Sequence, residues 1–153
     1  MPTTHQHPTP LAFDELVAEL RAWATGDLGL EAAVNLLTAH RSWLARRDFR
    51  DTCVVATPGH LVDDFDLARV WLDFAAAARV ADGGQLPASD SERQILALAA
   101  GLAGYATSRP LHDLITGLDQ HNTGLVLDAI AHTAGRPAAS QAYRVTGSVE
   151  EAQ

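Results

Sequence analysis

The sequence predicts an all-α protein: a compact bundle of about six to seven helices around a central apolar helix from Ile95 to Ala106. Three observations lead to this prediction. Apolar residues recur at every third or fourth position in several segments, as they do in amphipathic helices. Glycine, proline or a capping residue bounds most of these segments. No segment alternates apolar and polar residues for long enough to predict a sheet, and the stretch from Tyr143 to Val145 is too short.

The chain length of 153 residues suits one domain, which we expect to span residues 10–135. Residues 1–9 are polar and lack the apolar core of a signal peptide, so we expect a flexible leader there. Helical periodicity is lost from residue 136, and residues 136–153 are expected to form a flexible tail. The longest apolar run would span about 18 Å as a helix, against a bilayer core of roughly 30 Å, so no membrane partner is expected.

Two amphipathic helices are predicted at the start of the domain. Thr9 can cap the first, Pro10 suits its first turn, and Gly26 ends it. Asp27 can then cap the second helix. The side chains expected to face inward are Phe13, Leu16, Val17, Leu20, Trp23 and Ala24 in the first helix, and Leu30, Ala33, Val34, Leu37 and Leu44 in the second.

The apolar stripe of the second helix is interrupted at His40 and Arg41, so either that helix bends near there or one of these polar groups lies at its edge. Asp48 resembles the cap of a short third helix, which Pro58 and Gly59 would stop. The inner face of this third helix is expected to hold Phe49, Thr52, Cys53 and Ala56.

A fourth helix is predicted to start in the acidic segment that contains Asp63, Asp64 and Asp66, because carboxylates favour the positive end of the helix dipole. Its inward side chains would be Phe65, Ala68, Trp71, Leu72, Ala75 and Ala78. A glycine- and proline-containing segment over residues 82–87 would connect it to the next element.

Ser89 and Glu92 form a capping box in front of the apolar run, which is the clearest start signal in the chain. The run is apolar on every side, so this fifth helix is expected to be the central element. Gly101 and Gly104 would each weaken it by about 1 kcal/mol relative to alanine, unless close packing against a neighbour compensates.

Two more helices are predicted after the break at Pro110. The sixth is short and runs from Leu111 to about Leu118. Asn122 can cap the seventh, and Gly135 suits its C-terminal end. The inward side chains of the seventh helix are expected to be Leu127, Ile130, Ala131 and Ala134.

Composition restricts the partners. The 11 basic residues are all arginine, and 19 acidic residues bring the net charge to -8 and the pI to about 5.2. This charge disfavours general binding to nucleic acid or to anionic membranes. The heavy use of arginine and alanine indicates a GC-rich bacterial genome. Cys53 is the only cysteine, which excludes an intramolecular disulfide and is typical of a cytoplasmic protein, and its position on an inner face predicts an inert thiol.

One segment of the chain is basic, with four arginines and one aspartate over residues 41–50. The candidate site for a phosphate, a nucleic acid or an acidic protein partner consists of Arg41, Trp43, Arg46, Arg47 and Arg50. The alternative is a structural corner, in which the tryptophan belongs to the core and the arginines bury their stems and pair with nearby carboxylates.

A second group of polar residues could bind a metal. His121, Asp128 and His132 share one face of the predicted seventh helix, and His112 or Asp113 could supply a further ligand. Solvent-facing polar positions explain the same pattern. The sequence has no HExxH motif, nucleophile elbow, phosphate loop or dinucleotide fingerprint, so no cofactor or metal is expected.

We therefore expect a non-enzymatic helical protein–protein interaction module, acting as an adaptor, regulator or assembly component in a bacterial cytoplasm. Apolar surface left over from its amphipathic helices would bind a protein partner or a second copy. Two alternatives stay open. One is a nucleic-acid-associated regulator that uses the arginines of residues 41–50, which requires them to be coplanar, exposed and unpaired. The other is a small metal-binding protein or enzyme that uses His112, His121, Asp128 and His132.

Overall fold

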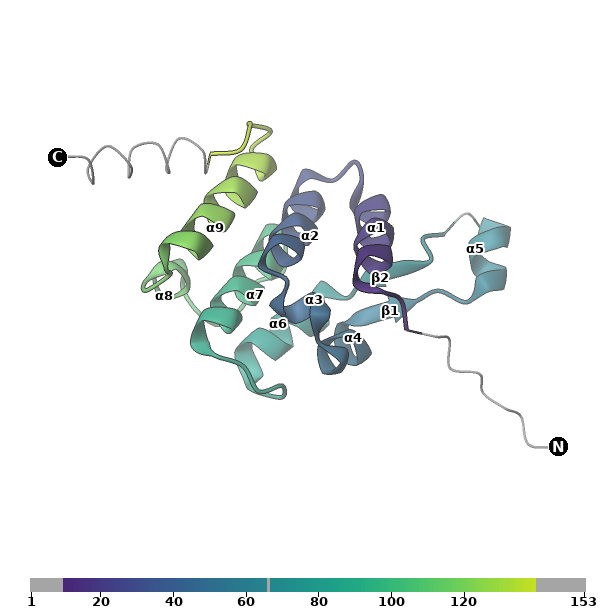
Figure 1. The fold of residues 1–153 in the computed structure, drawn as a ribbon, viewed down its shortest axis with the longest axis horizontal. Helices are drawn as coiled ribbons and strands as arrows, with labels where there is room; N and C mark the ends of the chain where they lie inside the picture. The colour runs from purple at the N-terminus through teal and green to yellow at the C-terminus, as the bar shows by residue number, and fades with distance from the viewer. Residues whose placement is uncertain (1–9, 66, 140–153) are drawn as a thin grey trace.

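The computed structural model describes residues 10–65 and 67–139, and over these ranges the protein is mainly α-helical, as the sequence predicts. Its elements follow one another along the chain as Figure 1 shows. They are α1 (Phe13–Ala24), α2 (Leu28–His40), α3 (Ser42–Ala45), α4 (Arg47–Cys53), β1 (Val54–Ala56), α5 (Gly59–Phe65), β2 (Val70–Leu72), α6 (Phe74–Gly83), α7 (Asp90–Leu102), α8 (Leu111–Ile115) and α9 (Gln120–Thr133).

Helix α2 lies between α1 and α9, and α7 packs against α2, α6, α8 and α9 (Figure 1). All side chains of α7 from Gln94 to Ala100 are buried. The predicted capping box is present, since Ser89 accepts from the Glu92 N–H while the Glu92 carboxylate accepts from the Ser89 N–H. The helix ends at Leu102 rather than at Ala106, because the chain turns at Gly104 with φ +93°.

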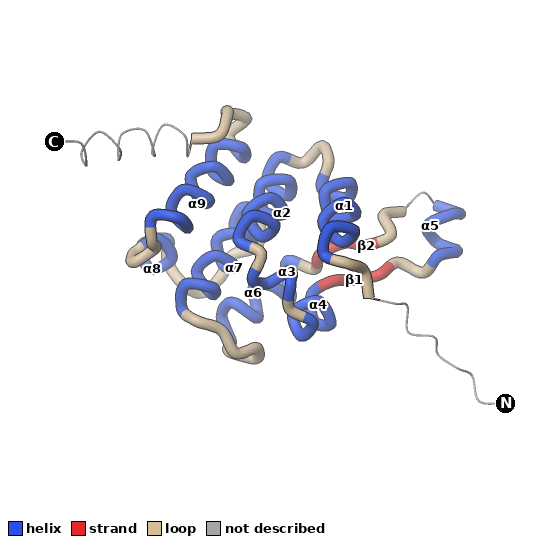
Figure 2. Tube along the Cα trace, viewed as in Figure 1, coloured by secondary structure: helices blue, strands red, loops and turns tan. Residues whose placement is uncertain are grey.

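A short antiparallel strand pair contradicts the expectation that the chain contains no sheet (Figure 2). Val54 pairs with Leu72, Val55 with Trp71 and Ala56 with Val70. The predicted fourth helix is therefore wrong over its first half, and α6 starts only after Asp73, whose side chain accepts from the Ala76 N–H. β-Branched and aromatic residues in the two segments favour strands. Each strand has only three residues and its partner lies far along the chain, so neither strand could be recognised from the apolar periodicity of the sequence.

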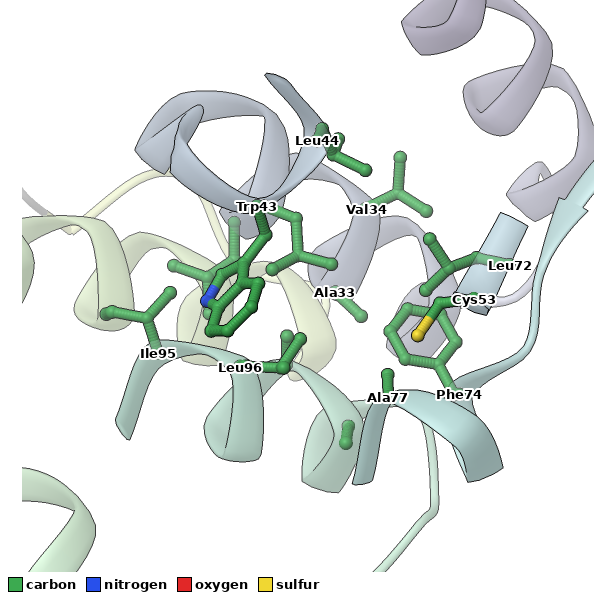
Figure 3. Packing of buried hydrophobic residues seen from close by; sticks show 14 of the residues in the cluster. Ala33, Val34, Trp43, Leu44, Cys53, Leu72, Phe74, Ala77, Ile95 and Leu96 are labelled. Atoms are coloured by element: carbon green, nitrogen blue, oxygen red, sulfur yellow. The ribbon is translucent and has the colours of Figure 1, made fainter. Parts of the chain in front are cut away.

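The core lies where α2, α3, α4, α6 and α7 meet (Figure 3). Trp43 and Phe49 are both fully buried and pack with their ring centroids 5.2 Å apart. The Trp43 indole N–H donates to the Glu92 carbonyl at 2.8 Å, so its one polar atom is satisfied. Cys53 is also fully buried, beside Leu72 and Phe74 in Figure 3.

Of the two alternatives for the second helix, the structure shows the bend, at Arg41, which has φ +67° and separates α2 from α3. The cap predicted for the third helix is wrong by two positions, because Arg46 occupies the N-cap of α4 and Asp48 lies inside its first turn. Its predicted inner face is half right: Phe49 and Cys53 are buried, but Thr52 is exposed and Ala56 lies in β1.

Helix boundaries elsewhere also differ from the predictions. The first helix begins at Phe13 after Ala12, and the predicted cap Thr9 lies outside the described residues. The sixth helix ends at Ile115, where Thr116 has left the helical conformation. Asp119 caps α9 in place of Asn122, which lies one turn further on and is buried.

The inner face predicted for the seventh helix is wrong at two of its four positions, since Leu127 and Ala131 are half buried. Ile130 is half exposed and Ala134 is exposed, whereas Gly124, Val126 and Ala129 face the body. Small residues on the inner side let α9 approach α2 closely, and hydrophobicity alone did not distinguish the two faces. The predicted leader, residues 1–9, and most of the predicted tail lie outside the described residues. Over the described ranges, no helix is long and apolar enough to cross a bilayer.

Candidate functional site

The arginines of residues 41–50 lie at the corner where α2, α3 and α4 meet. The Arg46 guanidinium binds the Asp48 carboxylate through two contacts of 2.9 and 2.6 Å and donates to the Pro87 carbonyl at 2.7 Å. It also lies 4.7 Å from the centroid of the Trp43 ring. The pairing raises the pKa of Arg46 and lowers the pKa of Asp48, chiefly through their shared hydrogen bond. Arg46 therefore connects α3, α4 and the segment before α7.

Arg50 has a comparable structural role. Its side chain is half buried and donates to the backbone carbonyls of Leu44 and Leu11, the latter at 2.7 Å. These bonds join α4 to the end of α3 and to the chain before α1. Trp43, the proposed stacking residue, is fully buried and offers no face to a ligand.

The two remaining arginines of this cluster are exposed. Arg47 is 89% exposed and lies 3.8 Å from Asp51, four residues on. The Arg41 guanidinium lies 4.2 Å from the centroid of the Phe13 ring. The nucleic-acid hypothesis requires coplanar, exposed and unpaired arginines, and Arg46 and Arg50 are neither fully exposed nor unpaired. Arg46 and Arg50 have the paired arrangement described for a structural corner, whereas Arg41 and Arg47 stay exposed.

The candidate metal ligands do not converge on one point. His112 and His121 are exposed, and His132 lies 3.3 Å from the Glu31 carboxylate of α2. In the part of the chain that the structure describes, no three histidine, cysteine, aspartate or glutamate side chains are grouped closely enough to hold a metal ion. Asp128 shares the α9 face of His132 and lines the same hollow in the surface.

Helix α5, which has no buried residue, and the strand pair that carries it were not predicted from the sequence. We call residues 54–65 and 67–72 the arm: β1, the connection that carries α5, and β2. Figure 1 shows α5 at the far end of this arm, beyond α1 and away from the other helices. Two bonds extend the strand ladder, from the Thr57 N–H to the Arg69 carbonyl and from the Asp73 N–H to the Cys53 carbonyl, both 2.8 Å.

The base of the arm is fixed to the body by aromatic packing. The ring centroids of Trp71 in β2 and Trp23 in α1 lie 6.5 Å apart, and the Trp23 ring stacks on that of Phe74 in α6 with a centroid distance of 6.3 Å. Val70 and Leu72 are buried on the other face of the strand. The base of the arm is therefore packed against α1 and α6.

The tip of the arm is apolar and uncovered. None of the residues of α5 is buried, although Leu61, Val62 and Phe65 fall on one side of this helix. The Phe65 side chain is 67% exposed, and Leu67, just beyond the helix, is 47% exposed. Asp63 and Asp64 are exposed on the same helix, so an acidic border lies beside the apolar residues. The sequence signal for this surface is an apolar–acidic segment next to Pro58 and Gly59.

A second feature is a polar pocket of about 310 Å³ between α1, α2 and α9. Arg21, Asn35, His132 and Arg136 line its polar side, and Leu36, Leu125 and Ala129 contribute apolar surface. The Arg21 Nε donates to the Asn35 side-chain oxygen at 3.3 Å, which positions both side chains on the same wall.

No protein-family model matches the chain, and no curated protein or solved structure is significantly similar to it.

Proposed function

We propose that this protein is a non-enzymatic helical protein–protein interaction module, a bundle built round the apolar helix α7 that binds its partner through the tip of the arm. The observation that carries the proposal is the exposure of Phe65 and Leu67 at the end of a projecting strand pair. Large apolar side chains that stay exposed to water at the end of a projecting element are typical of binding surfaces.

The arm tip favours a separate protein over a second copy. Its apolar side chains lie next to Asp63 and Asp64, and the whole chain carries a net charge of -8. Like charges therefore oppose docking of the tip onto another copy, whereas a recess bordered by lysine or arginine would attract it. We propose a partner with an apolar recess edged by basic side chains, in a bacterial cytoplasm.

The interaction is tested with a benzoyl-phenylalanine photo-crosslinker at position 65 of the full chain, in the cells that make the protein. A matched control carries the crosslinker at position 111, because Leu111 is 63% exposed on α8, outside the arm. We expect a crosslinked adduct with one protein from position 65 and none from position 111.

Affinity measurements with that purified protein complete the test. Phe65→Ser is expected to weaken binding at least tenfold, because burying a phenylalanine contributes roughly 1.5–3 kcal/mol. The Leu111→Ser control is expected to leave affinity unchanged, and neither variant should change the free energy of unfolding by more than about 0.5 kcal/mol. The double variant Asp63→Arg with Asp64→Arg should also lose binding. Equal affinity for wild type and Phe65→Ser, or a crosslink between two copies, would refute the proposed partner.

A further inference from the structure

The outer edge of β1 carries backbone hydrogen-bonding groups that point away from β2. In an antiparallel pair, successive residues of a strand direct their N–H and C=O groups alternately toward the partner strand and away from it. The two bonds that extend the ladder use the Cys53 carbonyl and the Thr57 N–H. The residues between these two that point outward are therefore Val54 and Ala56.

Three of the four backbone groups on this edge are free. The Val54 N–H donates to the Arg50 carbonyl at the end of α4. Within the part of the chain that the structure describes, no hydrogen bond involves the Val54 C=O, the Ala56 N–H or the Ala56 C=O. Ala56 is exposed and Val54 is half buried, so these groups are open to water at one straight edge.

The free edge of the strand pair is that of β1. Helix α1 packs on β2, and Figure 1 shows β1 on the side of β2 away from α1. Val70 and Leu72 of β2 are buried. Pro58 has no N–H and ends the β1 edge on the side of the tip, so the edge accommodates only a short extended segment.

An unpaired strand edge binds an extended peptide, whose own N–H and C=O groups continue the ladder. A strand from another protein can pair with all three free groups, through both backbone groups of the residue opposite Ala56 and the N–H of the residue opposite Val54. A second copy of β1 can pair with only two in either antiparallel register, because its Pro58 has no N–H and its Val54 N–H is already bonded. The net charge of -8 also opposes a second copy.

We propose that β1 binds an extended segment of a partner protein as a third strand of the arm. The segment donates to the Val54 and Ala56 carbonyls and accepts from the Ala56 N–H. This inference rests on the proposed function and deepens it, since it states what the partner contributes beside the tip.

A library of random linear dodecapeptides displayed on phage tests the inference, with selection on the full chain and counter-selection on Ala56→Pro. This substitution removes the free N–H, and proline is accepted on edge strands where the N–H lies outside the ladder. Ala12→Pro is the matched control, because Ala12 is exposed before α1 and its φ of -59° suits proline. We expect peptides that bind the wild type and Ala12→Pro equally and bind Ala56→Pro at least tenfold more weakly.

Two measurements on the wild type do not depend on how a variant folds. The Ala56 amide should exchange its hydrogen at least tenfold more slowly in the peptide complex than in the free protein. The Val55 amide, which points toward β2, should be protected in both. Methylation of the peptide nitrogens that face β1 should weaken binding at least tenfold, and methylation of the alternate nitrogens should leave the affinity within about twofold.

No peptide that survives counter-selection, unchanged exchange at Ala56, or equal effects of the two methylation patterns would each overturn the inference. Phe65→Ser, which tests the tip, should leave peptide affinity unchanged, and lost peptide binding in that variant would place the peptide at the tip and overturn the inference as well. A failed peptide selection leaves a crosslink from position 65 standing, and an absent crosslink leaves the peptide result standing. The two proposals therefore fail separately.

Discussion

Two helical glycines are expected to respond in opposite directions to the same substitution. Gly29 lies in the first turn of α2 and Gly101 in the last turn of α7. An ideal Cβ at Gly29 would lie 2.5 Å from the Leu102 carbonyl oxygen of α7, a separation that real Cβ atoms essentially never show. A Cβ at Gly101 would meet nothing within 4 Å. Replacing either glycine by alanine therefore gives the same gain in helix propensity, but only at Gly29 does the new Cβ collide with another helix.

The expected change in the free energy of unfolding follows from these distances. To bring the new Cβ to 3.0 Å, the backbones of α2 and α7 must separate by at least about 0.5 Å, and a gap of that size forfeits about a quarter of each dispersion contact. Overpacking of this kind costs about 1–3 kcal/mol, which exceeds the gain in helix propensity of at most about 1 kcal/mol. We therefore expect Gly29→Ala to be destabilising and Gly101→Ala to be stabilising by about 0.5–1 kcal/mol.

Urea unfolding of the full chain, followed by circular dichroism at 222 nm, measures both effects. Once the propensity gain is subtracted, the net cost of Gly29→Ala is about 0.5–2 kcal/mol, so with a slope of about 2 kcal/mol/M it should lower the midpoint by about 0.25–1 M, and Gly101→Ala should raise it slightly. Gly101→Ala is the internal control, because it reports the propensity gain without the close approach. A Gly29→Ala protein as stable as the wild type would show that α2 and α7 do not approach as closely as described.

Two other predictions concern titratable groups. Burial, and to a lesser degree Asp73, raises the pKa of the Cys53 thiol to about 12, so a disulfide reagent at pH 8 should label Cys53 only after unfolding in urea. The unfolded thiol loses its proton near pH 9, whereas the folded thiol keeps it. The free energy of unfolding of the wild type should therefore fall relative to that of Cys53→Ala as pH rises from about 9 toward 12. Parallel plots of this free energy against pH for the two proteins would contradict the prediction. The hydrogen bond from Ser42, followed by that from the Ser89 N–H, lowers the pKa of Glu92. The stability that these hydrogen bonds give the folded state is fully present above pH 4.5, the ordinary pKa of a glutamate, and is lost as pH falls through the lowered pKa of Glu92. Ser42→Ala should therefore lower the free energy of unfolding by about 1 kcal/mol at pH 7, and by less in acid, where Glu92 is protonated. A loss of stability that is the same at every pH would refute the role of the Glu92 carboxylate.

The predictions that succeeded depend on neighbours in the chain. Asp27 caps α2 by accepting from the Leu30 N–H at 3.0 Å, and the capping box of α7 involves residues three positions apart. The break at Arg41 follows from an interrupted apolar stripe. Each of these features is complete within one or two helical turns, so the sequence is sufficient to predict it.

The candidate sites depended on groups that a sequence does not display. Arg46 and Arg50 bind backbone carbonyls, including those of Pro87 and Leu11, and every residue in a chain carries such an acceptor. No residue pattern therefore separates a paired arginine from a free one. The strands of the arm were missed for a similar reason, because Val54 finds its partner at Leu72 across an intervening helix.

The sequence by itself determined a mainly helical chain, a net negative charge, the N-caps of α2 and α7 and a buried apolar segment in α7, since composition and short-range periodicity suffice for these. Tertiary structure alone decided which face of α9 turns inward, that Arg46 and Arg50 are paired within the protein, and that Phe65 and Leu67 stay exposed at the end of an arm. The physical reason is that burial and pairing are properties of two segments in contact. An apolar side chain has the same hydrophobicity whether or not another segment covers it.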